Sequence, residues 1–320
     1  MNKKLRLISL FIFLIAGIAF VIWLRNENHK NKLKQEFKQQ LSEYTGSVKP
    51  CAVNPEFPKD HGLVPPYMID LRQKGYRGLR ILEYRENGKI LQLPSWSEFG
   101  WLGLHTVDKT GNIYVSSIPH ESIVHNPVGE QNRILKLDHL TGELFHFMDL
   151  PQKEPSTLNN PFGAMGLHFD CDNEYLYVSS VAGSSMREEL GSLFQIELGT
   201  KKVISSLENT DAIGLATYNT EKGKRVYYGK ARTAEVYSIG LDENGSFSGQ
   251  PSFEFSLLEQ NGGADDRAHR IRFNEDKMEI KASEFNFTLA AASNPMHNIY
   301  LFEYDHSKDT WSFLSVQAEK

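Results

Sequence analysis

The chain has 320 residues, 40 % of them hydrophobic and 23 % charged, which is enough for one large domain or two ordinary ones with an ample core. Its net charge of −5 provides no basic field for nucleic acid, so nucleic acid is excluded as a partner. The 24 glycines and the aromatic content of 11 % favour a β-rich fold with many tight turns.

The first feature along the chain is an apolar segment. The 18 residues from Leu7 to Leu24 carry no formal charge, and this is close to the length at which a helix crosses a bilayer. A cleaved signal peptide is the alternative, but its apolar region is shorter and ends in small residues. Here the segment ends in Trp23, Leu24 and Arg25. The sequence therefore predicts an uncleaved membrane anchor over residues 1–25.

The charges around this segment give opposing indications of its orientation. Lys3, Lys4 and Arg6 favour a cytoplasmic N-terminus. Five cations on the other side favour the reverse by the positive-inside rule: Arg25, Lys30, Lys32, Lys34 and Lys38. Because a long downstream domain can be translocated whatever its nearby charge, we expect a single-pass membrane protein whose domain faces the periplasm or the cell exterior.

Residues 26–66 are expected to connect the anchor to the domain. Four apolar residues spaced four, four and three apart fall on one helical stripe and indicate a short amphipathic helix: Leu33, Phe37, Leu41 and Tyr44. This helix packs on the domain, lies on lipid headgroups or stands as a solvated spacer. The following stretch to Pro66 has several prolines and no period, and is interpreted as an irregular lead-in. Its Cys51 forms one disulfide with Cys171 in an oxidising compartment, or both remain thiols.

Residues 67–320 repeat themselves, which indicates the fold better than any single strand. Residues 103–117 read GLHTVDKTGNIYVSS and residues 166–180 read GLHFDCDNEYLYVSS. Weaker copies begin at Gly214 and His269. Each copy is two short strands around a turn that contains Asp, Asn or Gly, as in a β-hairpin.

A second kind of hairpin alternates with these copies, over residues 79–94, 133–150, 192–208, 235–255 and 299–316. Two hairpins make a four-stranded unit, and the unit starts lie 48 to 63 residues apart, which suits a propeller blade with variable loops. The predicted fold is therefore all-β, a β-propeller of five or six blades. A sixth blade would need strands from residues 285–291 and from the lead-in.

Residues 160–180 and 211–242 resemble a blade of the six-bladed propellers of the senescence-marker-protein and gluconolactonase family and of the strictosidine-synthase-like proteins. The resemblance covers roughly residues 79–316 and is one of blade rhythm. It implies a divalent cation held by oxygen ligands just before the glycine of each inner strand. Those positions hold Leu102, Met165 and Ile213, which cannot ligate a cation, so no metal ligand stands at the expected positions. A register shift of two residues would restore Asp211 as a ligand.

Several residues are candidates for chemistry. The glycine-led loop at residues 262–272, GGADDRAHRIR, suits a polar ligand or acid–base chemistry, and the alternative is an ion-paired surface loop. It supplies six polar side chains: Asp265, Asp266, Arg267, His269, Arg270 and Arg272. His105 and His168 occupy the same place in two sequence repeats, where two imidazoles either share a metal or proton near the axis or are structural.

The sequence supports two functions. The first is a membrane-anchored ligand-binding or protein-interaction module, with Arg267, His105 and His168 as ligand-binding candidates and an unknown protein or small molecule as partner. The alternative is a lactonase-like or esterase-like hydrolase that uses calcium or zinc, with Asp211, Asp265, Asp266 and His269 as catalytic candidates. The first predicts no cofactor, and the second predicts a divalent cation.

Overall fold

The computed structural model describes residues 20, 23–25, 44–119, 127–260, 265–288 and 297–318. Chain contacts divide it into two compact units, Met1–Tyr44 and Thr45–Lys320. The predicted anchor and amphipathic helix fall mainly outside the described residues; of the first unit, Phe20 and residues 23–25 are described, and they are helical. No helix within the described part of the chain is long and apolar enough to cross a membrane.

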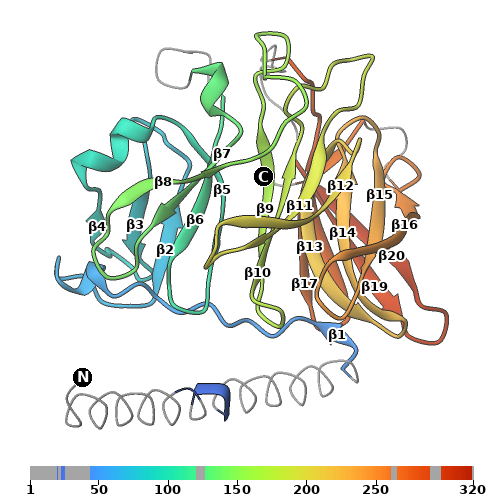
Figure 1. Ribbon diagram of the computed structural model, residues 1–320, viewed down its shortest axis with the longest axis horizontal. Coiled ribbons are helices and arrows are strands. Elements are labelled where there is room, and N and C mark those ends of the chain that lie inside the picture. The colour runs from blue at the N-terminus through green and yellow to red at the C-terminus, as the bar shows by residue number, and fades with distance from the viewer. Residues whose placement is uncertain are drawn as a thin grey trace, which may run out of the picture. The chain divides into compact units, whose positions relative to one another are not determined.

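The second unit is built from five antiparallel sheets arranged around a central axis (Figure 1). The first sheet has three strands, β2 (Tyr67–Asp70), β3 (Arg80–Glu83) and β4 (Ile90–Leu91). The second contains β5 (Leu102–Val107), β6 (Ile113–Ser117), β7 (Arg133–Leu137) and β8 (Leu144–Asp149). The third contains β9 (Ala164–Asp170), β10 (Tyr175–Ser180), β11 (Ser192–Glu197) and β12 (Lys202–Glu208).

The fourth sheet contains β13 (Ala212–Thr220), β14 (Gly223–Lys230), β15 (Glu235–Leu241) and β16 (Phe247–Ser256). The fifth contains β17 (Arg267–Asn274), β18 (Lys277–Ser283), β19 (Asn298–Asp305) and β20 (Thr310–Ala318). Three short 3₁₀ helices lie in the connections: η1 (Phe57–Lys59), η2 (Pro94–Phe99) and η3 (Val128–Glu130). The fold is a five-bladed β-propeller. Residues 285–288 form no strand, so the sixth blade considered from the sequence is absent from the described chain.

Aspartates at the ends of strands initiate the hairpin turns. Asp108 Oδ1 accepts hydrogen bonds from the backbone amides of Thr110 and Asn112, at 2.8 and 3.0 Å. Asp242 Oδ1 does the same for Asn244 and Ser246, both at 2.8 Å. A short carboxylate that binds the amides two to four residues ahead fixes the reversal of the chain, which explains the Asp-rich turns of the repeats.

The core is divided among the interfaces between consecutive blades. One apolar cluster joins the first and second blades, and others join the second to the third, the third to the fourth, and the fourth to the fifth. Among the described residues no such cluster joins the fifth blade to the first. The ring therefore has a seam between its ends that core packing does not close.

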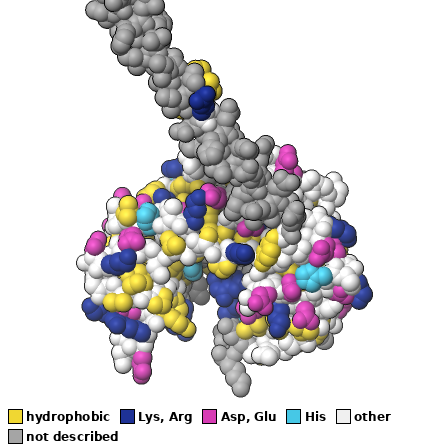
Figure 2. Space-filling model, turned by 90° about the horizontal axis from the view of Figure 1, so that it is seen from below, with side chains coloured by type: hydrophobic (Ala, Val, Ile, Leu, Met, Phe, Trp, Pro, Cys, Tyr) yellow, Lys and Arg dark blue, Asp and Glu magenta, His cyan; other side chains and the backbone are white. Residues whose placement is uncertain are grey.

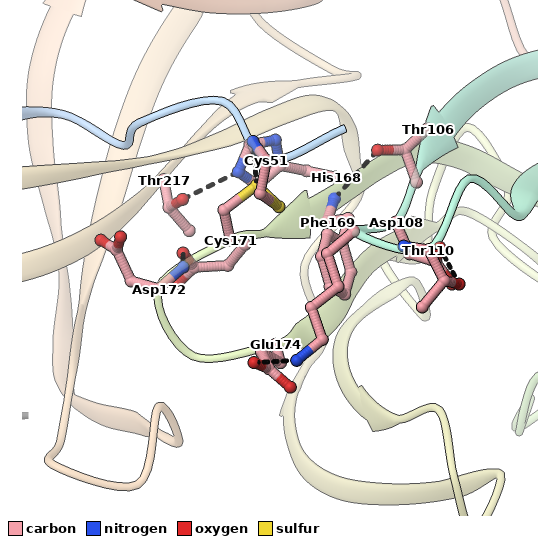
Figure 3. Close-up of a disulfide and its surroundings, with 12 residues drawn as sticks. Cys51, Thr106, Asp108, Thr110, His168, Phe169, Cys171, Asp172, Glu174 and Thr217 are labelled. Carbon is pink, nitrogen blue, oxygen red and sulfur yellow. Dashed lines mark hydrogen bonds and ion pairs between the residues drawn. A yellow bond between two sulfur atoms is a disulfide. The ribbon is translucent and has the colours of Figure 1, made fainter. Parts of the chain in front are cut away.

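Residues 46–63, which we call the strap, run along one face of the propeller from the fourth blade to the first (Figure 1). The strap begins with β1 (Gly46–Ser47), which pairs with β13 on the edge opposite β14, toward the axis. Ser47 Oγ accepts a hydrogen bond of 2.9 Å from the backbone amide of Glu275 in the fifth blade. Cys51 is disulfide-bonded to Cys171 in the third blade (Figure 3).

The remainder of the strap contacts the other two blades. The backbone amide of Glu56 donates a 2.8 Å hydrogen bond to the His139 carbonyl oxygen, in the second blade. Phe57 packs edge-on against the buried Trp96, with ring centroids 6.0 Å apart. Lys89 Nζ, in the first blade, donates a 2.7 Å hydrogen bond to the Gly62 carbonyl oxygen. The strap therefore connects all five blades, including the two that flank the seam.

Candidate ligand-binding site

The inner strands enclose two adjoining cavities near the axis. The larger cavity has a volume of about 510 Å³ and is bounded by β2, β5 and the start of β9, with residues of β17. We call it the apolar chamber because six hydrophobic side chains line it: Met68, Ile69, Leu71, Leu102, Leu104 and Ile118. The smaller, about 160 Å³, is lined by five basic side chains and is called the polar chamber: His105, His168, His269, Arg270 and Arg272. Leu104, His105, His269 and Arg270 line both chambers.

Irregular pairing at one level of four inner strands shapes these chambers. The register shifts between Leu102 and His105 in β5, beside Met165 in β9, between Ala212 and Leu215 in β13, and at His269 in β17. Each inner strand has one residue more than its partner at this level, which is a β-bulge. A bulge bends the strand and redirects a side chain, and here Met165 and His269 are directed into the apolar chamber.

The bulges also correct the sequence alignment of the two histidines. His105 pairs with Val115, whereas His168 pairs with Tyr177, whose counterpart in the second blade is Tyr114. The two histidines are therefore one residue out of register, and successive residues of a strand point to opposite faces. Both line the polar chamber, but they do not occupy equivalent positions. His168 Nε2 is hydrogen-bonded to Thr217 Oγ1 at 2.8 Å (Figure 3).

The three imidazoles of the polar chamber are held in the neutral form. Burial, together with the charges of Arg270 and Arg272, lowers the pKa of His105 to about 4. Burial also lowers the pKa values of His168 and His269 to about 4. An imidazole removed from water loses the hydration that stabilises its charged form, so each ring is neutral at pH 7.

The positive charge of the polar chamber comes from two arginines of β17. Arg270 and Arg272 are two residues apart, so they share one face of the strand. Burial and the charge of Arg272 both lower the pKa of Arg270. Figure 2 shows Lys and Arg side chains gathered in a hollow at the centre of the face that it views. The one acidic residue among the described lining, Asp70, is bound to Arg72 at 2.7 Å and is buried.

Three of the candidate residues instead have structural contacts: Asp211 and Arg267 each join two blades, and Asp266 binds within the fifth blade. Asp211 Oδ2 pairs with Arg232 Nε at 2.7 Å, and Asp211 Oδ1 accepts a hydrogen bond from the Gly191 amide at 3.0 Å. Burial nevertheless raises the pKa of Asp211. Asp266 Oδ2 accepts hydrogen bonds from Asn298 Nδ2 at 2.7 Å and Tyr300 Oη at 2.6 Å.

Arg267 also connects two blades. Its guanidinium donates to the carbonyl oxygens of Ala231 and Arg232, both at 3.1 Å, and pairs with the exposed Asp265. None of Asp211, Asp265, Asp266 and Arg267 is among the residues that line the two chambers. Of the predicted site residues, the structure brings His105, His168 and His269 together there.

The positions examined for metal ligands are hydrophobic in the structure as well. Leu102 and Ile213 are fully buried, and Met165 lines the apolar chamber. Among the described residues no group of three His, Cys, Asp or Glu side chains is placed to hold a metal ion. The imidazoles and guanidiniums of the polar chamber are not the oxygen donors that calcium requires, and the guanidiniums repel a divalent cation.

Arg270 and Arg272 belong to the polar loop expected from the sequence but not to its candidate site residues, and the apolar lining from β2 and Ile118 was not expected at all. The alternating His-Arg-Ile-Arg motif of β17 was a usable signal, because residues two apart on an inner strand share a face. The contribution of β2 had no such signal, since its residues belong to no repeat copy.

Comparisons with known proteins bear on the fold alone. No family model and no curated protein matches the sequence. Among solved structures, a luciferin-regenerating enzyme is 14 % identical with a TM-score of 0.46, over 87 % of this chain and 78 % of that one. The endo-arabinase of Bacteroides thetaiotaomicron is 12 % identical with a TM-score of 0.40, over 68 % and 79 %. A putative 6-phosphogluconolactonase of Bacteroides uniformis is 10 % identical with a TM-score of 0.41, over 80 % and 84 %.

Proposed function

We propose that this protein is a ligand-binding β-propeller that takes the apolar body of a small molecule into its apolar chamber. The observation that carries the proposal is a cavity of about 510 Å³ at the axis, lined mainly by aliphatic side chains and methionines. Small-molecule sites have volumes of roughly 300–1,000 Å³ and such linings, with a few polar groups at one side. The polar chamber supplies those polar groups.

A metal-dependent lactonase or esterase of the gluconolactonase type is the weaker alternative. Such an enzyme needs oxygen ligands for a hard cation, whereas Leu102, Met165 and Ile213 stand at the expected positions. Asp211 and Asp266, which would supply carboxylates, are occupied by Arg232 and by Asn298 and Tyr300. A shift in melting temperature with calcium or zinc, together with turnover of a lactone or ester, would favour the enzyme.

Binding in the apolar chamber is tested with the neutral dye N-phenyl-1-naphthylamine, whose fluorescence rises in apolar surroundings. Ile118 lines the chamber and is 37 % exposed, so Ile118→Trp fills the chamber without disturbing a buried core. We expect a saturable rise in fluorescence that this variant reduces at least tenfold in affinity. Ile90→Trp, at a residue 57 % exposed and remote from the lining, is the matched control and should bind as the wild type does. Equal binding by both variants would contradict the proposal.

We further propose that the propeller is anchored in a membrane by the segment from Leu7 to Leu24 and lies outside the cytoplasm. Support comes from the 18 uncharged residues of that segment and from the Cys51–Cys171 disulfide, because structural disulfides persist mainly in oxidising compartments. A C-terminal alkaline phosphatase fusion should be active in intact cells, and an otherwise identical fusion that lacks residues 1–25 should be inactive. Activity of both fusions, or of neither, would overturn this placement.

A further inference from the structure

The polar chamber contains more positive charge than its described surroundings neutralise. Arg270, half-buried and in contact with both chambers, has no hydrogen-bond or ion-pair partner among the described residues. Arg272 lines the same small space and adds a second guanidinium. Its cross-strand neighbour is Glu279, an exposed residue that forms no ion pair with either arginine within the described chain. No described carboxylate lines the polar chamber.

A second, independent observation is an unpaired imidazole at the same place. His269 is the bulged residue of β17, and its Nε2 atom is buried without a hydrogen-bond partner in the described structure. A buried polar atom of this kind is destabilising when no partner satisfies it. In contrast, His168 already uses its Nε2 with Thr217. His269, whose Nε2 atom has no partner within the described chain, therefore lines the same two chambers as Arg270.

Two guanidiniums and a neutral imidazole in one small cavity are complementary to an anion. Guanidinium groups bind carboxylates and phosphates through two parallel hydrogen bonds, and a bound anion would offset the mutual repulsion of the two arginines. We propose that the polar chamber is a subsite for an organic anion, a carboxylate or a phosphate monoester, bound by the guanidiniums of Arg270 and Arg272.

The connection between the two chambers defines the class of ligand. Both chambers are lined by four residues: Leu104, His105, His269 and Arg270. An anion bound to Arg270 can therefore extend its apolar part along this shared lining into the apolar chamber. The ligand is therefore an amphipathic anion, with its charged head in the polar chamber and its apolar body in the larger one. This inference rests on the proposed binding function and adds the chemistry of the ligand.

The test compares four probes that share a ten-carbon chain: decanoate, decyl phosphate, decanol and decyltrimethylammonium. Each displaces N-phenyl-1-naphthylamine from the full-length protein, in mild detergent and below the micelle concentration of the probe. We expect decanoate or decyl phosphate to bind about 10- to 100-fold more tightly than decanol, as charge-assisted hydrogen bonds imply, and the ammonium probe to bind most weakly. The stronger of the two anions identifies the head group.

The variants Arg270→Gln and Arg272→Gln should each reduce the preference for the anion over decanol to about threefold or less, because the affinity for the anion falls more than the affinity for decanol. Lys277→Gln removes an exposed cation of the same blade away from both chambers, and should retain the full preference. Circular dichroism and melting temperature identify any variant that fails to fold. If Arg270→Gln fails to fold, Arg272→Gln still provides the test, because Arg272 is an exposed residue.

The outcomes separate the two proposals. If decanol and the anions bind equally well and Ile118→Trp still blocks both, the apolar chamber binds ligands but the anion subsite is wrong. If none of the probes displaces the dye, or if the dye does not bind, the proposed binding function itself is wrong.

Discussion

Neutral histidines in the polar chamber make stability depend on pH. The pKa of His168 is about 4 in the folded protein and about 6.5 in the unfolded chain. Above pH 6.5 both states are neutral and the group has no effect. Between pH 6.5 and 4 only the unfolded chain binds the proton, so the free energy of unfolding decreases as pH falls. His105 and His269 add contributions of the same sign.

We therefore predict that His168→Gln weakens the acid sensitivity of the protein. The glutamine amide can retain a hydrogen bond to Thr217 but does not titrate, so the slope of unfolding free energy against pH should decrease by up to about 1.4 kcal/mol per pH unit between pH 6 and 5. Urea denaturation at a series of pH values measures this slope. Equal slopes for variant and wild type would show that His168 is protonated in the folded protein.

The exposed His306 is a control with the opposite sign. Hydrogen bonds to Glu221 and Asp276 raise its pKa, so its contribution to stability is present below its unfolded pKa and is lost as pH rises through the folded one. His306→Gln should therefore remove a gain in stability that the wild type makes as pH falls toward 6.5, and it should leave the slope between pH 6 and 5 unchanged.

Chemically suggestive residues were harder to interpret from sequence than apolar ones. The sequence presents Asp265, Asp266, Arg267 and His269 as one dense polar loop, and the structure gives them three different surroundings. Asp266 binds two side chains of β19, which the pairing of β17 with β18 and of β18 with β19 brings near, and Arg267 binds two carbonyl oxygens of the fourth blade. Such long-range contacts leave no local signal in the sequence. The bulge then separates His269 from them and directs it to the cavity.

At the scale of single elements, the repeated glycine of the inner strands has a steric cause. A Cβ atom on Gly166 would lie 2.5 Å from the Ile213 carbonyl oxygen, and one on Gly214 would lie 2.5 Å from the Ala268 carbonyl oxygen. In both cases the atom that approaches belongs to the inner strand of the next blade. The glycine is thus required because adjacent inner strands meet backbone to backbone at the level of the bulges.

We predict that Gly214→Ala lowers the free energy of unfolding by about 1–3 kcal/mol, the usual cost of overpacking, because the backbone of β17 must move. Gly199→Ala is the control: its Cβ would meet no heavy atom within 4 Å, and the change should be within about 0.5 kcal/mol. Chemical denaturation compares the two variants. Similar stabilities would mean that β13 and β17 are less closely packed than described.

Repeats predicted the elements well because a blade is a local structure. The strand pairs β5–β6, β9–β10, β13–β14 and β17–β18 fall where the repeat copies lie, and the turns of the first two begin at Asp108 and Asp170. Register was less predictable. A bulge adds a residue without changing the hydrophobic pattern, so the Gly-Leu-His motifs align in sequence and are offset by one in the pairing.

For the whole molecule, the sequence indicated five or six blades but not how the ring is closed. The fifth blade, β17–β20, is formed entirely by the C-terminal part of the chain. The strap spans the ring instead, and its bonds link segments separated by more than a hundred residues, such as Ser47 with Glu275. An irregular proline-containing segment shows no period from which such contacts can be predicted.

The disulfide should accordingly contribute to the stability of the whole ring. Cys51 and Cys171 are 120 residues apart, and a cross-link over a loop of this length removes much conformational freedom from the unfolded chain. We predict that the double variant Cys51→Ser with Cys171→Ser loses about 2–5 kcal/mol of unfolding free energy, measured by urea denaturation.

The same disulfide allows a control within one sample. Dithiothreitol should lower the urea midpoint of the wild type to that of the double variant and leave the variant unchanged, because the variant has no cysteine to reduce. Since the strap holds both blades beside the seam, limited proteolysis should also cleave residues 46–63 faster in the reduced protein. If reduction changes neither the midpoint nor the cleavage rate, the hydrogen bonds of Ser47, Glu56 and Gly62 hold the strap without the disulfide.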